Sequence, residues 1–130
     1  MVNNCLFLEN AAVTTAAGRG AFGGAIRSGN SNLKVLDSIF KNNTAIQADT
    51  TPGFGGGGAI YAALTDVLVL SSVFELNEAS KNGGAAQLQS TTSVAWYNNK
   101  ELLLGNDALN CDGAKVITGD CFNVGENFSF

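Results

Sequence analysis

Short runs with an apolar residue at every second position recur along the chain. The clearest apolar pairs are Leu33 and Val35, Val67 and Val69, and Val94 and Trp96. Alternation over such short runs indicates β-strands that bury one face. Helices are a poor alternative, because the runs are rich in valine and are interrupted by glycine and asparagine. The pattern therefore predicts an all-β protein.

A Phe-x-x-Asn motif recurs after these runs. Its copies are Phe7–Asn10, Phe40–Asn43 and Phe74–Asn77, with a degenerate copy at Leu103–Asn106. The phenylalanines at positions 7, 40 and 74 are 33 and then 34 residues apart. An alanine follows two places after the asparagine in the last three copies. A fixed interval of this size is typical of a repeat architecture.

A glycine element precedes each later copy of the motif. It reads Gly-Gly-Ala-Ile at 23–26 and at 57–60, and Gly-Gly-Ala-Ala at 83–86. The first glycine lies 17 residues before the phenylalanine in both complete units, and 20 residues before Leu103 in the third. The glycine element and the Phe-x-x-Asn motif thus mark the two ends of one repeated unit.

Each unit reads as three short strands, separated by polar bends and followed by a loop, with no helix. One such unit cannot bury its apolar face alone, but stacked units form a continuous core in which each strand pairs in parallel with its counterpart. We therefore expect a single-stranded parallel β-helix of about three to four turns. It would occupy residues 1–108, and residues 109–130 would form a C-terminal cap with a last strand at Val116-Ile117.

Stacking assigns a structural role to each repeated residue. The phenylalanines would form an interior aromatic stack; they are Phe7, Phe40 and Phe74. The asparagines would lie at one corner of every turn, in the left-handed conformation that a sharp bend requires, and would form an amide ladder; they are Asn10, Asn43, Asn77 and Asn106. The glycines would allow tight turns where a side chain would clash; they are Gly23, Gly24, Gly57, Gly58, Gly83 and Gly84.

The paired motifs resemble the repeats of the polymorphic outer membrane proteins of chlamydiae. Those repeats alternate a Gly-Gly-Ala-Ile element with a Phe-x-x-Asn element, and here the resemblance runs from Cys5 to about Ala108. It implies a right-handed parallel β-helix linked to surface display and adhesion. The motifs end after Ala108, and the chain shows no sign of the autotransporter barrel that the bacterial family carries.

The ends of the stack raise separate expectations. The first motif has no glycine element before it, so we expect the open N-terminal face to be covered by the rest of a longer chain or by a partner protein. Cys111 and Cys121 flank a glycine-containing turn and are candidates for a disulfide that staples the cap; the alternative is two free thiols in a reducing compartment. Cys5 aligns with Ile39 and Val73 as a strand residue.

Charge and composition restrict the functions that the chain can have. Only 14% of the 130 residues are charged and the net charge is −4, which argues against a nucleic-acid partner. No apolar run is long enough for a membrane-spanning helix. The absence of histidine removes Ser-His and Cys-His catalysis, and we expect no cofactor or metal. Acids of a carbohydrate-active site would have to come from Glu9, Glu75 and Glu78, near the bases Arg27 and Lys41.

These features favour a non-catalytic structural or adhesive β-helix module of a surface or secreted protein. The expected location is the extracellular space, the cell surface or another oxidising compartment. A carbohydrate-binding or carbohydrate-active β-helix, with glycans as partners, is one alternative, and an accessory subunit of a larger assembly is another. The segments Asn10–Phe22 and Thr44–Phe54 are the longest and most variable, where repeat proteins often bind ligands.

Overall fold

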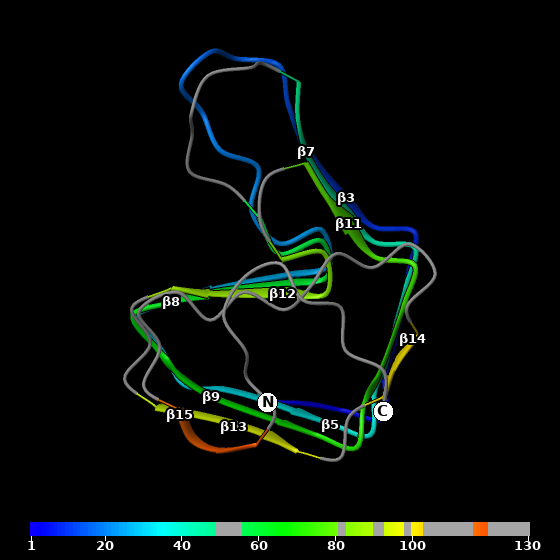
Figure 1. Cartoon of the computed structure of the whole chain (residues 1–130), viewed down its shortest axis with the longest axis vertical. Helices are drawn as coiled ribbons and strands as arrows, with labels where there is room; N and C mark the ends of the chain where they lie inside the picture. The colour runs from blue at the N-terminus through cyan, green and yellow to red at the C-terminus, as the bar shows by residue number, and fades with distance from the viewer. Residues whose placement is uncertain (49–55, 81–82, 90–92, 98–99, 103–115, 120–130) are drawn as a thin grey trace.

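A computed structural model of the chain describes residues 1–48, 56–80, 83–89, 93–97, 100–102 and 116–119 (Figure 1). The first coil holds β1 (Val2–Asn3), β2 (Leu6–Leu8), β3 (Ala11–Thr14) and β4 (Ile26–Gly29). The second holds β5 (Leu33–Leu36), β6 (Ile39–Lys41), β7 (Thr44–Gln47) and β8 (Ile60–Ala63). The third holds β9 (Asp66–Leu70), β10 (Val73–Glu75), β11 (Glu78–Ala79) and β12 (Ala86–Gln89). Beyond it lie β13 (Ser93–Tyr97), β14 (Lys100–Leu102) and β15 (Val116–Gly119).

Every strand pairs in parallel with its counterpart one coil away. The pairing produces four sheets with the strand orders β1-β5-β9-β13-β15, β2-β6-β10-β14, β3-β7-β11 and β4-β8-β12. No described residue belongs to a helix of the length and apolarity needed to cross a membrane. The chain is thus an all-β parallel β-helix of about three turns, as the repeats predicted.

Three of the sheets surround a triangular core, and the fourth projects from it (Figure 1). We call the three-sided part, made by the β1, β2 and β4 sheets, the prism. We call the β3-β7-β11 sheet with residues 15–22 the arm. The prism core contains Val35, Phe40, Ile60, Phe74 and Leu88, whose exposed fraction is 0%. A parallel strand stack buries residues at every second position, which explains the apolar alternation in the sequence.

The predicted apolar positions are in register. Leu33 pairs with Val67 and Val35 with Val69 between β5 and β9. Val67 pairs with Val94 and Val69 with Trp96 between β9 and β13. The alternation therefore predicted both the strands and their alignment. A last strand at Val116-Ile117 is also confirmed, because β15 pairs in parallel with β13.

The structure adds a fourth strand to each unit, where the sequence predicted a loop. β3 and β7 occupy the first part of the segments Asn10–Phe22 and Thr44–Phe54. Ala12, Ala45 and Ala79 pack with Ala21 into a small second core inside the arm. The strand was missed because its inward positions hold alanine and then a polar residue, Thr14 or Gln47, which together give no apolar alternation.

The degenerate copy of the motif was aligned wrongly. β14 places Glu101, and not Leu103, opposite Phe74. The reason is the number of residues between the two strands. β5 ends at Leu36 and β6 begins at Ile39. In the later coil β13 ends at Tyr97 and β14 begins at Lys100, which is the same interval. The corner therefore keeps its length, whereas the alignment of Leu103 required a longer one. Leu103 and Asn106 themselves lie outside the described residues.

Candidate functional site

The repeated asparagines lie one above another and are joined by their side chains. Asn10 Nδ2 donates to Asn43 Oδ1 at 2.9 Å, and Asn43 Nδ2 donates to Asn77 Oδ1 at 2.9 Å. In each pair, the backbone N–H of the donating asparagine also donates to the same oxygen, at 3.1 Å for Asn10 and 3.0 Å for Asn43. Asn43 and Asn77 have an exposed fraction of 0%, so these bonds satisfy polar groups that water cannot reach.

The second amide hydrogen of Asn43 and of Asn77 reaches the Phe-bearing strand of the preceding coil. Asn43 Nδ2 donates to Phe7 O at 3.1 Å, and Asn77 Nδ2 donates to Phe40 O at 3.0 Å. One asparagine thus ties a corner to the motif phenylalanine of the preceding coil. Because the acceptor is a backbone carbonyl, this link fixes the position of the asparagine relative to the preceding coil.

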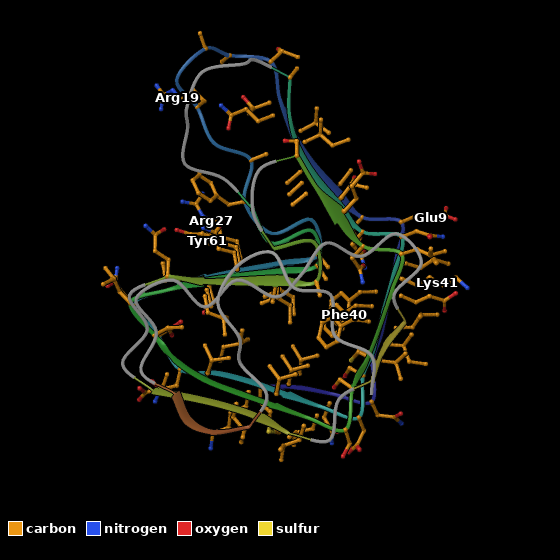
Figure 2. All side chains as sticks on the ribbon, in the orientation of Figure 1. Glu9, Arg19, Arg27, Phe40, Lys41 and Tyr61 are labelled. Atoms are coloured by element: carbon orange, nitrogen blue, oxygen red, sulfur yellow. The ribbon has the colours of Figure 1, made fainter. Side chains whose placement is uncertain are left out.

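The motif phenylalanines form a continuous stack beside the ladder. The ring centroids of Phe7 and Phe40 are 4.7 Å apart with planes 2° from parallel, and those of Phe40 and Phe74 are 4.9 Å apart at 3°. The three residues are also directly paired in the β2-β6-β10 sheet. Figure 2 shows Phe40 pointing into the prism. The spacing equals that of neighbouring strands, so stacked rings fit a parallel coil without distortion.

The glycine pairs lie where successive coils touch the start of the arm. Gly57 has a φ of +69°, a left-handed conformation that favours glycine. A Cβ on Gly58 would overlap the carbonyl oxygens of Gly84 and Glu78. Gly58 N also donates to Gly83 O at 3.0 Å, one coil on. The first glycine therefore makes the turn and the second permits close approach, and the same holds for Gly23 and Gly24.

The left-handed residue at the ladder corner is not the asparagine that the sequence suggested. Positive φ values belong to the preceding residues, which are Glu9 at 55°, Asn42 at 54° and Leu76 at 54°. The ladder asparagine follows the bend, and its side chain points inward to bond the next coil. The prediction was wrong because the corner imposes the conformation on whatever residue stands there, including a leucine.

A second ladder, which the sequence analysis missed, runs along another corner. Ser38 N donates to Ser72 Oγ at 3.2 Å, and Cys5 N donates to Ser38 Oγ at 3.2 Å. Ser38 Oγ donates to Leu36 O, and Cys5 Sγ makes the corresponding contact to Asn3 O at 3.2 Å. Cys5 therefore aligns with Ser38, and its alignment with Ile39 was off by one residue. The bend serines, visible in the repeats, were the available signal.

Among the candidate acidic residues, Glu9 points away from the prism (Figure 2). Lys41 Nζ lies 2.9 Å from Glu75 Oε1, and the two side chains form an ion pair on the outer face of the β2-β6-β10 sheet. Glu9 and Glu78 are exposed, on the corner and on β11. Within the described residues, no three acids or cysteines lie close enough to hold a metal ion. The ion pair between coils gives Glu75 a structural partner.

An aromatic cluster lies where the arm meets the β4-β8-β12 sheet (Figure 2). The Phe22 ring packs on Tyr61 with centroids 4.6 Å apart, and the Arg27 guanidinium lies 4.9 Å from the centre of the Phe22 ring. The Tyr61 hydroxyl donates to Gln89 Oε1 at 2.7 Å. Burial raises the pKa of Tyr61 above its ordinary value of 10.0, and the positive charge of Arg27 partly offsets this.

The proposed disulfide and the last ladder residue cannot be placed. Cys111, Cys121 and Asn106 all lie outside the described residues, and so does most of the expected cap. They remain predictions.

One comparison with known proteins identifies a repeat in the chain. The family model of the Chlamydia polymorphic membrane protein repeat matches residues 37–63. The matched segment begins at the corner before β6 and ends with β8, so it contains both Phe40-x-x-Asn43 and Gly57-Gly58-Ala59-Ile60. No curated protein and no solved structure matches the chain significantly.

Proposed function

Because residues 37–63 form a repeat of the polymorphic membrane protein type, we propose that this chain is a non-catalytic adhesive module of a surface or secreted protein. The observation that carries the proposal is that the repeated residues make contacts between coils. Phenylalanine, asparagine and glycine recur because they join one coil to the next. The repeat thus builds a scaffold, and recognition falls to whatever the scaffold displays.

The arm is the part best suited to display. It projects from the prism (Figure 1). Its first two strands, β3 and β7, carry exposed aliphatic residues. Val13 is 61% exposed and Ile46, its partner one coil on, is 37% exposed. Apolar side chains that stand in register on a projecting sheet favour contact with another macromolecule.

A bead-retention assay tests this proposal. Beads coated with the chain should be retained on a panel of cultured cells more strongly than albumin-coated beads. The double variant Val13→Asp/Ile46→Asp should reduce retention by about tenfold, because it places two charges on the contact surface. The matched control is Leu64→Asp/Leu76→Asp, which changes exposed leucines at prism corners and should leave retention unchanged. Retention no better than albumin, or equal loss in both double variants, would overturn the proposal.

A second candidate, carbohydrate binding, is favoured by the cluster of Phe22, Tyr61 and Arg27. Aromatic rings beside a guanidinium group and a glutamine amide offer both apolar contact and hydrogen bonds to a sugar. A glycan array tests it: hits lost together in Phe22→Ala and Arg27→Ala, but retained in Leu64→Asp, would support this function. An array without hits would exclude it for the glycans present.

A further inference from the structure

The first coil leaves one end of the core partly open. β1, β2, β3 and β4 are the terminal strands of their sheets on this side. Their inward residues Val2, Phe7 and Ile26 are only partly buried, whereas Phe40 and Ile60 in the second coil are fully buried. The face therefore presents apolar side chains together with unpaired strand edges.

The free backbone groups of β2 belong to Leu6 and Leu8. Ile39 N donates to Cys5 O at 2.8 Å, and Glu9 N donates to Lys41 O at 3.0 Å. Phe7 O accepts from Asn43. Positions 5, 7 and 9 thus direct their backbone groups toward the second coil. Because successive residues of a strand point these groups to opposite edges, Leu6 and Leu8 direct theirs away from the protein.

The outer surface of β2 also differs from that of its neighbours. Leu6 and Leu8 are 62% and 47% exposed, and both are apolar. At the position of Leu8, the next two coils carry Lys41 and Glu75, which pair with each other. A partner can therefore cover β2 without removing a charged group from water. Covering β6 or β10 in the same way would desolvate Lys41 or Glu75.

The strand Leu6-Phe7-Leu8 reads the same in both directions. We propose that a second copy of this chain docks on the first coil, with the two β2 strands antiparallel about a two-fold axis at Phe7. A two-fold interface must be self-complementary, and a palindromic edge strand meets that condition. The interface continues the one between coils, in which Phe7 already stacks on Phe40.

The hydrogen-bonding directions fit this arrangement. Leu6 lies opposite Leu8 of the second copy, and the two exchange both of their backbone hydrogen bonds. Phe7 faces its own counterpart as the non-hydrogen-bonded pair, in which side chains approach most closely. Cross-strand Leu–Leu pairs then cover the outer side.

The remaining sheets also meet in pairs. Since the prism is three-sided (Figure 1), the axis through the β2 sheet exchanges the β1 and β4 sheets. Val2 of one copy is thereby brought over Ile26 of the other, which covers both partly buried residues. The arms lie on opposite sides of the dimer. Docking is independent of adhesion: a monomeric chain would leave the proposed function intact.

The solution mass tests the proposal. Analytical ultracentrifugation of the chain at micromolar concentration should give twice the chain mass of 13.4 kDa. Leu8→Pro removes an N–H that faces the free edge, together with the leucine side chain of the cross-strand pair, and breaks no backbone hydrogen bond to the second coil, so it should retain the fold and yield a monomer. A wild-type monomer, or a folded Leu8→Pro variant that remains a dimer, would overturn the proposal.

Val13→Pro is the matched control. Thr44 N donates to Asn10 O at 2.9 Å and Ala48 N to Thr14 O at 3.0 Å, so Val13 on β3 also directs its N–H to the free edge. It lies on the arm, outside the proposed contact, and this variant should remain a dimer. Loss of the dimer in Val13→Pro as well as in Leu8→Pro would contradict docking through β2.

Disulfide trapping tests the register even if Leu8→Pro fails to fold. Residues opposite each other in such a pair have Cα atoms about 5.5 Å apart, within the range of a disulfide. A mixture of the Leu6→Cys and Leu8→Cys proteins should form a covalent dimer on oxidation, with a 6-to-8 linkage in mass spectrometry. Each variant alone should form far less of a linkage at its introduced cysteine. Equal yields in the mixture and in the separate proteins would refute the register.

Discussion

Asn43 donates its side-chain amide to Asn77 Oδ1 at 2.9 Å, and its backbone N–H donates to the same oxygen at 3.0 Å. The other amide hydrogen binds Phe7 O. Asn43 Oδ1 in turn accepts from Asn10 Nδ2. The position thus requires both a donor and an acceptor on one short side chain. Aspartate lacks the donor, and alanine lacks both groups. The amide ladder therefore accounts for an asparagine in every described coil.

Replacing Asn43 tests the ladder energetically. Asn43→Ala should lower the free energy of unfolding by about 3 kcal/mol, because it removes the side-chain hydrogen bonds that Asn43 makes with Asn10, Asn77 and Phe7 at a corner that water does not reach. Urea unfolding monitored by circular dichroism measures this loss. The control is Asn30→Ala, which is exposed and outside the ladder and should cost about 1 kcal/mol for its left-handed backbone. Similar losses in both variants would mean that the ladder contributes little.

The aromatic stack should be most sensitive at its centre. Phe40→Ala should cost about 4 kcal/mol, since it removes a fully buried ring and the contacts on both of its faces. Phe7→Ala should cost clearly less in the monomer, because within one copy Phe7 is only partly buried and stacks on one described ring. Thermal and urea unfolding of the two variants compares them. The stack loses its assigned role if Phe7→Ala proves as costly as Phe40→Ala.

The glycine corner should tolerate no side chain. Gly58→Ala places a Cβ against the backbone carbonyls of Gly84 and Glu78, which cannot move without opening the stack. We expect a loss above about 4 kcal/mol, enough to prevent folding in many small domains. Gly18→Ala is the control: it has a φ of +72° but open space around it, so it should cost about 1 kcal/mol. Soluble expression and circular dichroism distinguish the two; a folded Gly58→Ala protein of near-normal stability contradicts the packing.

Tyr61 should make stability depend on alkaline pH. Burial raises its pKa, so the folded protein holds the phenolic proton more tightly than the unfolded chain does. Its contribution to stability is fully present below the unfolded pKa, near 10.0, and is lost as the pH rises through the higher folded value. Tyr61→Phe should therefore weaken the decline in unfolding free energy above pH 10.0.

The same variant loses the hydrogen bond to Gln89 and should cost about 1 kcal/mol at neutral pH. Tyr97→Phe serves as the control, because it removes the other tyrosine of the chain. Unfolding curves at neutral and alkaline pH supply the comparison. An alkaline decline that is unchanged in Tyr61→Phe would show that this phenol is not responsible.

The sequence predicted the features that depend on the repeat period. Residues at equal positions in successive units must lie one above another in a parallel coil, so Phe40 over Phe74 and Asn43 over Asn77 followed from spacing alone. The prism strands also followed, because valine and leucine alternate along them. The fourth strand did not follow, since its inward positions hold alanine, threonine or glutamine and give almost no apolar signal.

Other features depend on contacts that the repeat does not encode. The left-handed corner holds Glu9, Asn42 and Leu76, three side chains with nothing in common, because the backbone path imposes the conformation. Phe22 of the first coil packs on Tyr61 of the second, and Phe22 lies in a connection whose length varies between units. The register of Glu101 was missed because the chemically similar residue, Leu103, suggested a longer corner.

The central claim is that like side chains of successive coils are in direct contact. Nuclear Overhauser spectroscopy on protein with assigned phenylalanine rings tests it most directly. We predict strong cross-peaks between the ring protons of Phe40 and Phe74, together with cross-peaks between the side-chain amides of Asn43 and Asn77. Well-resolved spectra of the folded chain that lack both sets would contradict the stacked coil.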